Sequence, residues 1–284
     1  MLNPHSAWRV EFARSLAEKI RPFRGVRAIV VAGSVARNYA DAYSDIEIPI
    51  FWDSLPDDTL RLAIVNQLNA SFLYGYDGPA AEDQLLINGV QVDLWHVSVA
   101  YENEIIQAVL RADKTDLSSL NAMDTARSCI PIYGHGIVEK WRNEAQAYPV
   151  DLAKRIIQEH IASFRIAELS VLAARDNPTA FYGHLSDLYR EMFLVLMALN
   201  RRYFPTYKWM NQVLSEITIK PAKIDQQLRQ AFSLLPAEAT GETRRLLVEI
   251  LGLVEAHFPS VDTVQAHKQL RYTRSAHQGP VTLE

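Results

Sequence analysis

The spacing of hydrophobic and polar residues changes character about halfway along the chain. Up to residue 147, short apolar runs alternate with helical stretches, and VRAIVVA (residues 26–32) predicts a buried strand because it is apolar and β-branched. From Asp151 to about Leu270, apolar residues recur at helical spacing almost throughout. The pattern predicts an α+β fold, with a mixed sheet flanked by helices in a domain at 1–147 and a helical bundle domain at 151–284.

Local signals refine this outline. Asn3 and Pro4 can open a helix that runs to about Arg21. Asn88-Gly89 lies between two apolar runs and predicts a tight hairpin turn. Pro49 removes a backbone donor from the strand SDIEIPIFW, which favours an edge or a bulge. In the second half, residues 151–176 predict one helix, residues 184–204 another, and at least three shorter helices follow.

Composition excludes several classes of protein. The formal charge is −4, from 29 basic and 33 acidic side chains, which argues against a surface that coats nucleic acid. The single cysteine, Cys129, allows no internal disulfide and suits a reducing compartment. The longest apolar run, Met192 to Leu199, is far shorter than the roughly 20 residues that cross a bilayer. We therefore expect a cytoplasmic protein that has no membrane partner.

Two carboxylates lie close together on the strand SDIEIPIFW. Alternate side chains of a strand share a face, so Asp45 and Glu47 point one way, and Ile46 and Ile48 point into the core. Two strand rises separate the acidic Cα atoms by about 7 Å. Such carboxylates can converge on Mg²⁺, which prefers carboxylate oxygens together with the phosphates of a substrate.

A third carboxylate follows in VQVDLWHV, where Asp93 shares a face with Gln91 and Trp95. If this strand pairs beside SDIEIPIFW, Asp93 completes a cluster of three acids. Such a cluster can hold two metal ions about 3.5–4 Å apart for in-line displacement at phosphorus.

The Gly-Ser pair before these acids suits a phosphate. Gly33 lets an anion approach the backbone without a Cβ in the way, and Ser34 offers a hydroxyl. A helix that begins here directs free N–H groups at the anion, and Arg37 lies about one turn further on.

Each feature also has an ordinary structural explanation. A Gly-Ser pair is usually only a turn, and lone strand acids such as Asp93 usually face solvent. It is their combination, in strand–turn–helix–strand order, that favours an active site. Four other acids are expected near the predicted active site and could either receive a cationic aminosugar or form a solvated rim: Glu82, Asp83, Glu102 and Glu104. His96 lies on the face opposite to Asp93, which indicates packing.

Residues 199–210 mix basic and aromatic side chains. They could stack a base and neutralise a phosphate. The favoured interpretation is a helix end whose aromatic rings pack a corner of the bundle.

At these residues the chain resembles the nucleotidyltransferase superfamily of DNA polymerase β type. The shared pattern is a Gly-Ser turn, a spacer of about ten residues, an acid-x-acid strand and a third acid on a later strand, over roughly residues 26–98. GSVARNYADAYSDIEI, VQVDLWHVSVAYENE and IPIYGHGIVEKW are similar to stretches of the antibiotic-modifying branch, of aminoglycoside 4'-O-nucleotidyltransferase type.

The resemblance implies a reaction and roles for residues. A nucleoside monophosphate, most often AMP from ATP, passes from a Mg²⁺-bound nucleoside triphosphate to a hydroxyl, and pyrophosphate is released. Asp45 and Glu47, with Asp93 as the third acid, would ligate magnesium, and Gly33, Ser34 and Arg37 would hold the triphosphate. Glu168 on the first helical stretch of the second domain would be the general base, with Glu159 as the alternative. The branch also implies a homodimer.

We therefore expect an enzyme that modifies a small molecule, such as an aminoglycoside- or lincosamide-like antibiotic, and so confers antibiotic resistance. One alternative is an adenylyltransferase that acts on a protein or an RNA, as an antitoxin does. The other is a nucleotide-binding protein without catalysis, against which the three intact acids argue.

Overall fold

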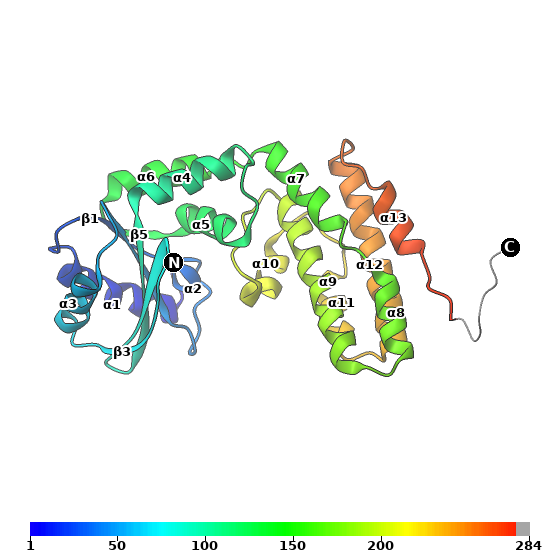
Figure 1. The fold of residues 1–284 in the computed structure, drawn as a ribbon, viewed down its shortest axis with the longest axis horizontal. Coiled ribbons are helices and arrows are strands. Elements are labelled where there is room, and N and C mark those ends of the chain that lie inside the picture. Colours follow the sequence, from blue (N-terminus) through cyan, green and yellow to red (C-terminus); the bar gives the residue numbers. More distant parts are fainter. Residues whose placement is uncertain (277–284) are drawn as a thin grey trace. The chain divides into compact units, whose positions relative to one another are not determined.

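The computed structural model describes residues 1–276 and divides the chain into two compact units. The first unit comprises Met1–Tyr148, and the second begins at Pro149. This boundary lies between the two stretches of sequence, 1–147 and 151–284, that were predicted as domains. Figure 1 shows a sheet with helices in the first unit and helices alone in the second, and each unit is described by itself below.

The first unit is built on a six-stranded mixed sheet with the order β3-β4-β5-β2-β1-β6. Its strands are β1 (Val26–Val31), β2 (Ile46–Trp52), β3 (Ser71–Tyr76), β4 (Ala80–Ile87), β5 (Val90–Ser98) and β6 (Ile130–Tyr133). Its helices are α1 (Pro4–Ile20), α2 (Gly33–Ala36), α3 (Asp58–Gln67), α4 (Val99–Leu110), α5 (Leu117–Ser128) and α6 (His135–Ala145). With the helical second unit, this confirms the predicted α+β class.

Strand β2 lies in the interior of the sheet, so the prediction of an edge strand from Pro49 is wrong, whereas the pairing with β1 does contain a register shift, between Val26 and Ala28. It runs parallel to β5 along its whole length and antiparallel to β1. The carbonyl of Glu47 accepts from the N–H of Ala32, so by alternation residue 49 also faces β1. The register with β1 ends at Ile50, and the bond from Ala32 to Glu47 follows on the other side of Pro49, so the missing N–H leaves a gap in this ladder without ending the strand.

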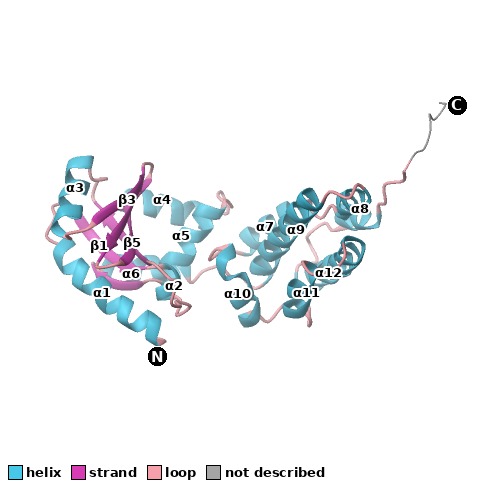
Figure 2. Ribbon diagram, turned by 90° about the horizontal axis from the view of Figure 1, so that it is seen from below, coloured by secondary structure: helices cyan, strands magenta, loops and turns pink. Residues whose placement is uncertain are grey.

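Helices cover both faces of the sheet (Figure 2). On one face α1 and α3 pack over a core that contains Ile46, Ile48 and Ile50, as the alternation predicts. On the other face lie α4, α5 and α6, where Phe51 packs against Trp141 with ring centroids 4.6 Å apart. The two faces of β2 therefore belong to different environments, and the predicted acids lie on the second.

Local turn signals were reliable in this unit. The hairpin between β4 and β5 turns at Asn88 and Gly89, whose φ angles are 51° and 81°. Helix α1 begins after Asn3, whose side chain accepts from the N–H of Ser6.

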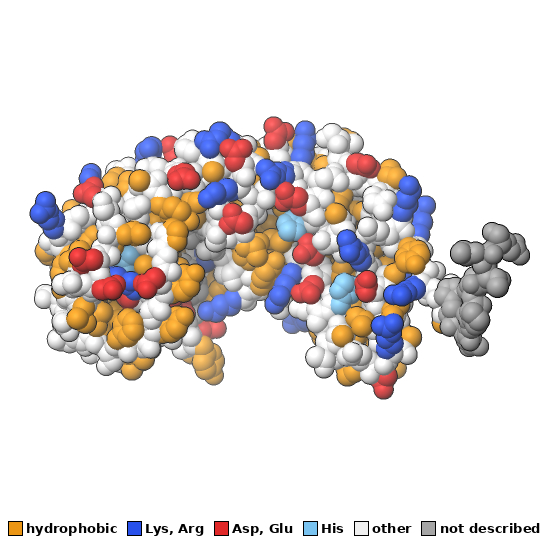
Figure 3. Space-filling view, viewed as in Figure 1, with side chains coloured by type: hydrophobic (Ala, Val, Ile, Leu, Met, Phe, Trp, Pro, Cys, Tyr) orange, Lys and Arg blue, Asp and Glu red, His pale blue; other side chains and the backbone are white. Residues whose placement is uncertain are grey.

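Strand β3 was not predicted. It is an edge strand, and its apolar side chains do not alternate with polar ones. Most of them are exposed, including Phe72, Leu73, Tyr74 and Tyr76. Figure 3 shows apolar side chains at the surface in this part of the molecule. Period-2 alternation, the main sequence signal of a strand, requires one buried face, and β3 has none.

The second unit is helical. Its elements are α7 (Val150–Ile161), α8 (Ile166–Ala174), α9 (Pro178–Leu199), the 3₁₀ turn η1 (Tyr207–Trp209), α10 (Met210–Glu216), α11 (Ile224–Ala231), α12 (Pro236–His257) and α13 (Val264–Arg271). The prediction of one helix over residues 151–176 is wrong, because residues 162–165 turn away and bury the ring of Phe164. Phe204 packs on Phe193 and Tyr207, which agrees with the favoured interpretation of residues 199–210.

The helices of residues 1–276 include none that is long and apolar enough to cross a membrane.

Candidate active site

Glu47 and Asp93 lie side by side in the centre of the sheet. The parallel register pairs these two residues directly, and alternation places both on the face covered by α4 and α5. Asp45 lies one residue before β2 begins and is half-buried. The structure therefore brings Asp93 beside the acid-x-acid segment, as the sequence requires for a shared site.

The three acids do not close around a common point. Within residues 1–276, no group of three His, Cys, Asp or Glu side chains is placed to hold a metal ion. The carboxylate of Asp93 instead accepts from the side-chain amide of Gln91 at 3.1 Å. The magnesium site at Asp45, Glu47 and Asp93 stays a prediction.

Gly33 touches the carboxylate of Glu47. Its φ is +62°, in the left-handed region, and a Cβ built on it would lie 1.9 Å from Oε2 of Glu47. No other residue fits, because any side chain would both strain the backbone and displace this acid. The Gly-Ser turn and the acidic strand, eleven residues apart at their nearest, are thus in direct contact.

Ser34 is 4% exposed, and its Oγ has no hydrogen-bond partner within the part of the chain that the structure describes. An unsatisfied buried hydroxyl costs about 1–3 kcal/mol. Such a cost is repaid when a ligand supplies the missing partner. The helix that contains Ser34, α2, is a single turn of four residues. The unsatisfied hydroxyl of Ser34 is therefore a stronger sign of a bound ligand than the N-terminus of this short helix.

Arg37 has a protein partner that the sequence did not reveal. Its Nε and Nη2 lie 2.7 and 2.5 Å from Oδ2 of Asp124 on α5, and both side chains are nearly buried. The pair fastens the turn at α2 to α5. Its charge is already neutralised in this state, and its predicted role with phosphate stays a prediction.

Arg9 is a second residue that sequence analysis missed. It is buried on α1, and its Nε and Nη2 donate to the carbonyl of Ser44 at 3.0 and 2.7 Å. Burial lowers its pKa, and the charges of Asp41 and Asp45 act against that shift. Arg9 thereby holds the backbone directly before Asp45. On an amphipathic helix an arginine normally faces solvent, so no local signal marks it.

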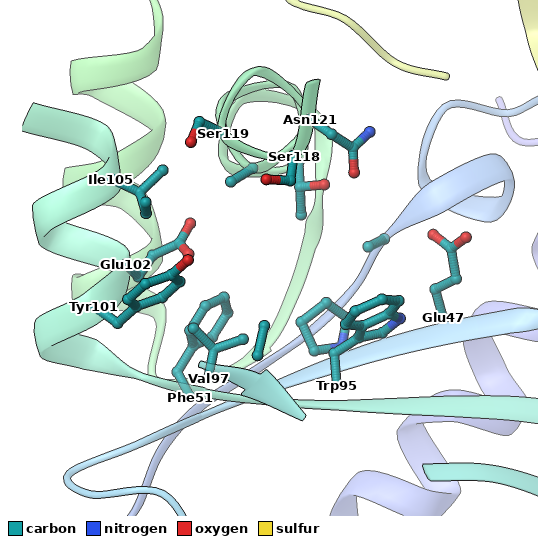
Figure 4. Close-up of a pocket in the computed structure, with 15 residues that line it drawn as sticks. Glu47, Phe51, Trp95, Val97, Tyr101, Glu102, Ile105, Ser118, Ser119 and Asn121 are labelled. Atoms are coloured by element: carbon teal, nitrogen blue, oxygen red, sulfur yellow. The ribbon is translucent and has the colours of Figure 1, made fainter. Parts of the chain in front are cut away.

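A cavity of about 230 Å³ opens between the sheet and helices α4 and α5 (Figure 4). Glu47, Phe51, Trp95 and Val97 border it from the sheet. Its other walls come from α4 and α5. The lining residues on these helices include Tyr101, Glu102, Ile105, Ser118, Ser119, Asn121 and Thr125. The cavity therefore adjoins Glu47 of the predicted catalytic acids, and its lining combines aromatic, aliphatic and hydroxyl side chains.

Glu102 projects into this cavity from the first turn of α4 and is only 5% exposed. Burial raises its pKa to about 8. Its interpretation as part of a solvated rim is therefore wrong, and at neutral pH the carboxyl is mostly protonated. The sequence does not indicate which acid of this helix is buried: Glu104 lies only two residues further along and is exposed.

Asp83 is not a rim residue either. It lies on the opposite face, 2% exposed, where Arg61 Nη2 and His96 Nε2 contact its carboxylate at 2.6 and 3.0 Å. Burial alone would raise the pKa of Asp83, but the hydrogen bonds from His96 and Arg61 outweigh it and lower the pKa to about 2. Trp52 Nε1 donates to His96 Nδ1, so His96 is packed, as predicted, and uses its Nε2–H for Asp83.

The two candidate general bases lie in the second unit. Glu168 is exposed on α8, beside a surface hollow that also includes Lys268 and Tyr272. Glu159 is exposed on α7, and its Oε1 accepts from Arg155 Nε at 2.9 Å. The role of Glu168 stays a prediction.

Comparisons with known proteins find only distant similarity. A model of a domain of unknown function (DUF4037) matches residues 121–210. Among solved structures, the chain is similar to the crystal structure of a nucleotidyltransferase-like protein from Exiguobacterium sibiricum 255-15, with 12% identity, a TM-score of 0.43, and coverage of 92% of this chain and 78% of that one. No curated protein matches the sequence. The assignment of function therefore rests on the residues of the site.

Proposed function

We propose that this protein is a Mg²⁺-dependent nucleotidyltransferase that transfers a nucleoside monophosphate, AMP from ATP, to a hydroxyl of a small molecule. The observation that carries the proposal is the contact between the Gly33-Ser34 turn and Glu47, with Asp93 beside Glu47 on the next strand. A turn suited to phosphate thus adjoins carboxylates suited to a hard cation. Small hydroxyl compounds of the aminoglycoside or lincosamide type are the proposed acceptors.

The chemistry of the donor atoms, though not yet their arrangement around one point, suits the metal ion that the reaction needs. Asp45, Glu47 and Asp93 supply only carboxylate oxygens, and the orphaned Oγ of Ser34 offers a bond to a phosphate oxygen. When bound, Mg²⁺ would neutralise charge on the phosphates. The proposed ligands are held in place by the protein: Glu47 and Asp93 by the parallel ladder, and Asp45 by Arg9 through the Ser44 carbonyl.

The chemistry is a substitution at the α-phosphorus. The acceptor hydroxyl oxygen forms a bond to the α-phosphorus, the bond from that phosphorus to the bridging oxygen breaks, and pyrophosphate leaves. The hydroxyl proton passes to a carboxylate, for which Glu168 is the proposed base. Positioning and charge neutralisation supply most of the rate enhancement in such transfers, which suits a site made of rigid strands and a tight turn.

The test is label transfer from α-labelled ATP with Mg²⁺. Acceptors are offered in parallel: an aminoglycoside and lincosamide panel, an extract of small metabolites, and a macromolecular fraction. The wild type should label a small compound, and the Asp45→Asn/Glu47→Gln double variant should lower the rate by at least about 10³-fold. Asp53→Asn, an exposed acid just after β2, is the matched control and should retain the wild-type rate.

Other outcomes redirect the proposal. Label on protein or RNA would show a macromolecular acceptor. Transfer to no fraction, with any nucleoside triphosphate, would contradict the enzymatic proposal. Equal rates in the double variant and the wild type would remove Asp45 and Glu47 from the mechanism.

A further inference from the structure

The cavity has a polar group at each end. Glu47, which contacts the Gly-Ser turn, lies at one side, and Glu102 projects from α4 at the other (Figure 4). Phe51 and Trp95 lie between them along the sheet. If phosphates bind at the turn, the part of a nucleotide that enters the cavity beyond Glu47 is its nucleoside end. Glu102 would then meet the base.

The size and lining of the cavity favour one flat ring system. Its volume of about 230 Å³ is below the roughly 300–1,000 Å³ of sites for drug-sized ligands, so an acceptor with several sugar rings does not fit. The rings of Phe51, Trp95 and Tyr101 offer surfaces for stacking, which favours a heterocycle. A cationic aminosugar would gain little from Glu102, since a protonated carboxyl carries no charge.

A protonated carboxyl has a hydrogen-bonding pattern of its own. Its O–H donates and its C=O accepts, side by side. Adenine presents the complementary pair on one edge, with N1 as acceptor and the N6 amino group as donor. An ionised carboxylate offers two acceptors, which instead match the N1–H and N2 amino group of guanine.

Resting on the proposed function, we propose that the cavity between β2, β5 and α4–α5 holds the nucleotide base, and that Glu102 selects adenine by donating to N1 and accepting from the N6 amino group. The carboxyl acts as a specificity-determining residue that touches the base. It takes no part in the transfer of the phosphoryl group.

The surroundings of Glu102 keep it neutral near pH 7. The other ionisable groups that line the cavity are Tyr101 on α4 and Glu47 on β2, and Cys129 after α5 interacts electrostatically with Glu102 and with Arg142 and Glu139 on α6. Arg142 is occupied by Glu139 and by the carbonyl of Cys129. The residues of α5 and β5 that line the cavity are uncharged. Burial, which raises the pKa of Glu102 to about 8, therefore prevails, and the adenine-binding form is the main one below that pH.

The experiment measures binding of ATP and GTP to the full chain with Mg²⁺ by calorimetry, at pH 7 and pH 9 and without an acceptor. The wild type should bind ATP at least about tenfold more tightly than GTP at pH 7, and the dissociation constant for ATP should rise about tenfold for each pH unit above 8. Glu102→Gln keeps one donor and one acceptor but cannot ionise. It should bind ATP equally well at both pH values.

Glu102→Leu, which has neither group, should weaken ATP binding at least about tenfold at pH 7. Glu104→Gln is the matched control, an exposed acid on the same helix, and should behave as wild type. Thermal unfolding of each variant shows that it is folded.

The outcomes separate the two proposals. Tight nucleotide binding without preference for the base, unchanged in Glu102→Gln and Glu102→Leu, would overturn the role of Glu102 and leave the transferase proposal standing. Failure of the wild type to bind any nucleotide would overturn the transferase proposal itself.

Discussion

Two buried carboxyl groups of the first unit show how differently one sheet can treat an acid. Asp83 on β4 lies against α3, where Arg61 and His96 contact its carboxylate, and its pKa is about 2. Glu102 on α4 lies on the other face, against a cavity, and its pKa is about 8. Burial is common to both, so the partner decides the charge. A partnered acid stabilises the fold, whereas one that faces a cavity is available to a ligand.

The largest loss of stability is expected when the charge of Asp83, the acid with buried partners, is removed. Asp83→Asn leaves the guanidinium of Arg61 without its buried counter-charge, which should cost about 3–5 kcal/mol in the free energy of unfolding, measured by urea at pH 7. Asp53→Asn is the control, because its pair with Arg27 is half-exposed and should contribute less than about 1 kcal/mol.

Urea unfolding repeated at acidic pH gives a second test of the role of Asp83. A carboxyl whose pKa is lowered on folding contributes stability above its unfolded pKa of about 4, and loses it as the pH falls toward 2. The wild type should lose about 2 kcal/mol in this window through Asp83, and the variant should lack this step. Parallel curves for the two proteins would contradict the ion-pair explanation.

Glu102 is expected to change the free energy of unfolding with pH in the opposite direction. Its folded pKa lies above the unfolded value of about 4.5, so its contribution is greatest below pH 4.5 and is lost as the pH rises toward 8. The free energy of unfolding of Glu102→Gln should therefore rise by about 3 kcal/mol relative to that of the wild type between pH 5 and pH 8, as measured by denaturant unfolding. Glu104→Gln should show no such trend, and a flat difference for Glu102→Gln as well would show that Glu102 is solvated.

Gly33→Ala tests the contact between the turn and the acidic strand. The added Cβ should displace the Glu47 carboxylate and lower the transfer rate about 100-fold, as a misplacement of about 1 Å does. Gly25→Ala is the matched control. Gly25 also has a positive φ, but its added Cβ would meet Trp52 at an ordinary 3.7 Å, so stability alone should suffer. Equal transfer rates for Gly33→Ala and Gly25→Ala would show that the contact between Gly33 and Glu47 is not needed for transfer.

The smallest effect is expected at Ser34. Ser34→Ala removes a buried hydroxyl that has no hydrogen-bond partner among residues 1–276, so the free protein should become about 1 kcal/mol more stable while its affinity for ATP falls. Ser6→Ala on α1 removes a hydroxyl that is likewise buried and has no partner in the described part of the chain, and it should stabilise the protein without a change in ATP affinity. A loss of ATP affinity in both variants would contradict a specific role for Ser34.

The features that the sequence predicted correctly depend on short-range geometry. Strand alternation placed Glu47 and Asp93 on one face, and Asn88-Gly89 marked its own turn. Pro49 shows where a local rule fails, because this interior strand keeps its pairing with β1 on both sides of the residue despite the missing N–H. Alternation gives the direction of a side chain but not what lies opposite to it.

The features that the sequence missed depend on contacts between distant segments. Arg37 and Asp124 are 87 residues apart, and Arg9 and Ser44 are 35 apart. No periodicity within one element can indicate such pairs. The burial of Glu102 likewise depends on α5 closing over the sheet, which the pattern of α4 alone does not contain.

The pairing of β6 with β1 has a consequence for the order of events during synthesis. Residues 130–133 complete the sheet beside residues 26–31, about a hundred positions earlier in the chain. The hairpins of β3, β4 and β5 need only near neighbours and can form early, whereas contacts between distant segments form late. The flank of the sheet that carries the Gly-Ser turn therefore stays unfinished on the ribosome until most of the first unit has emerged.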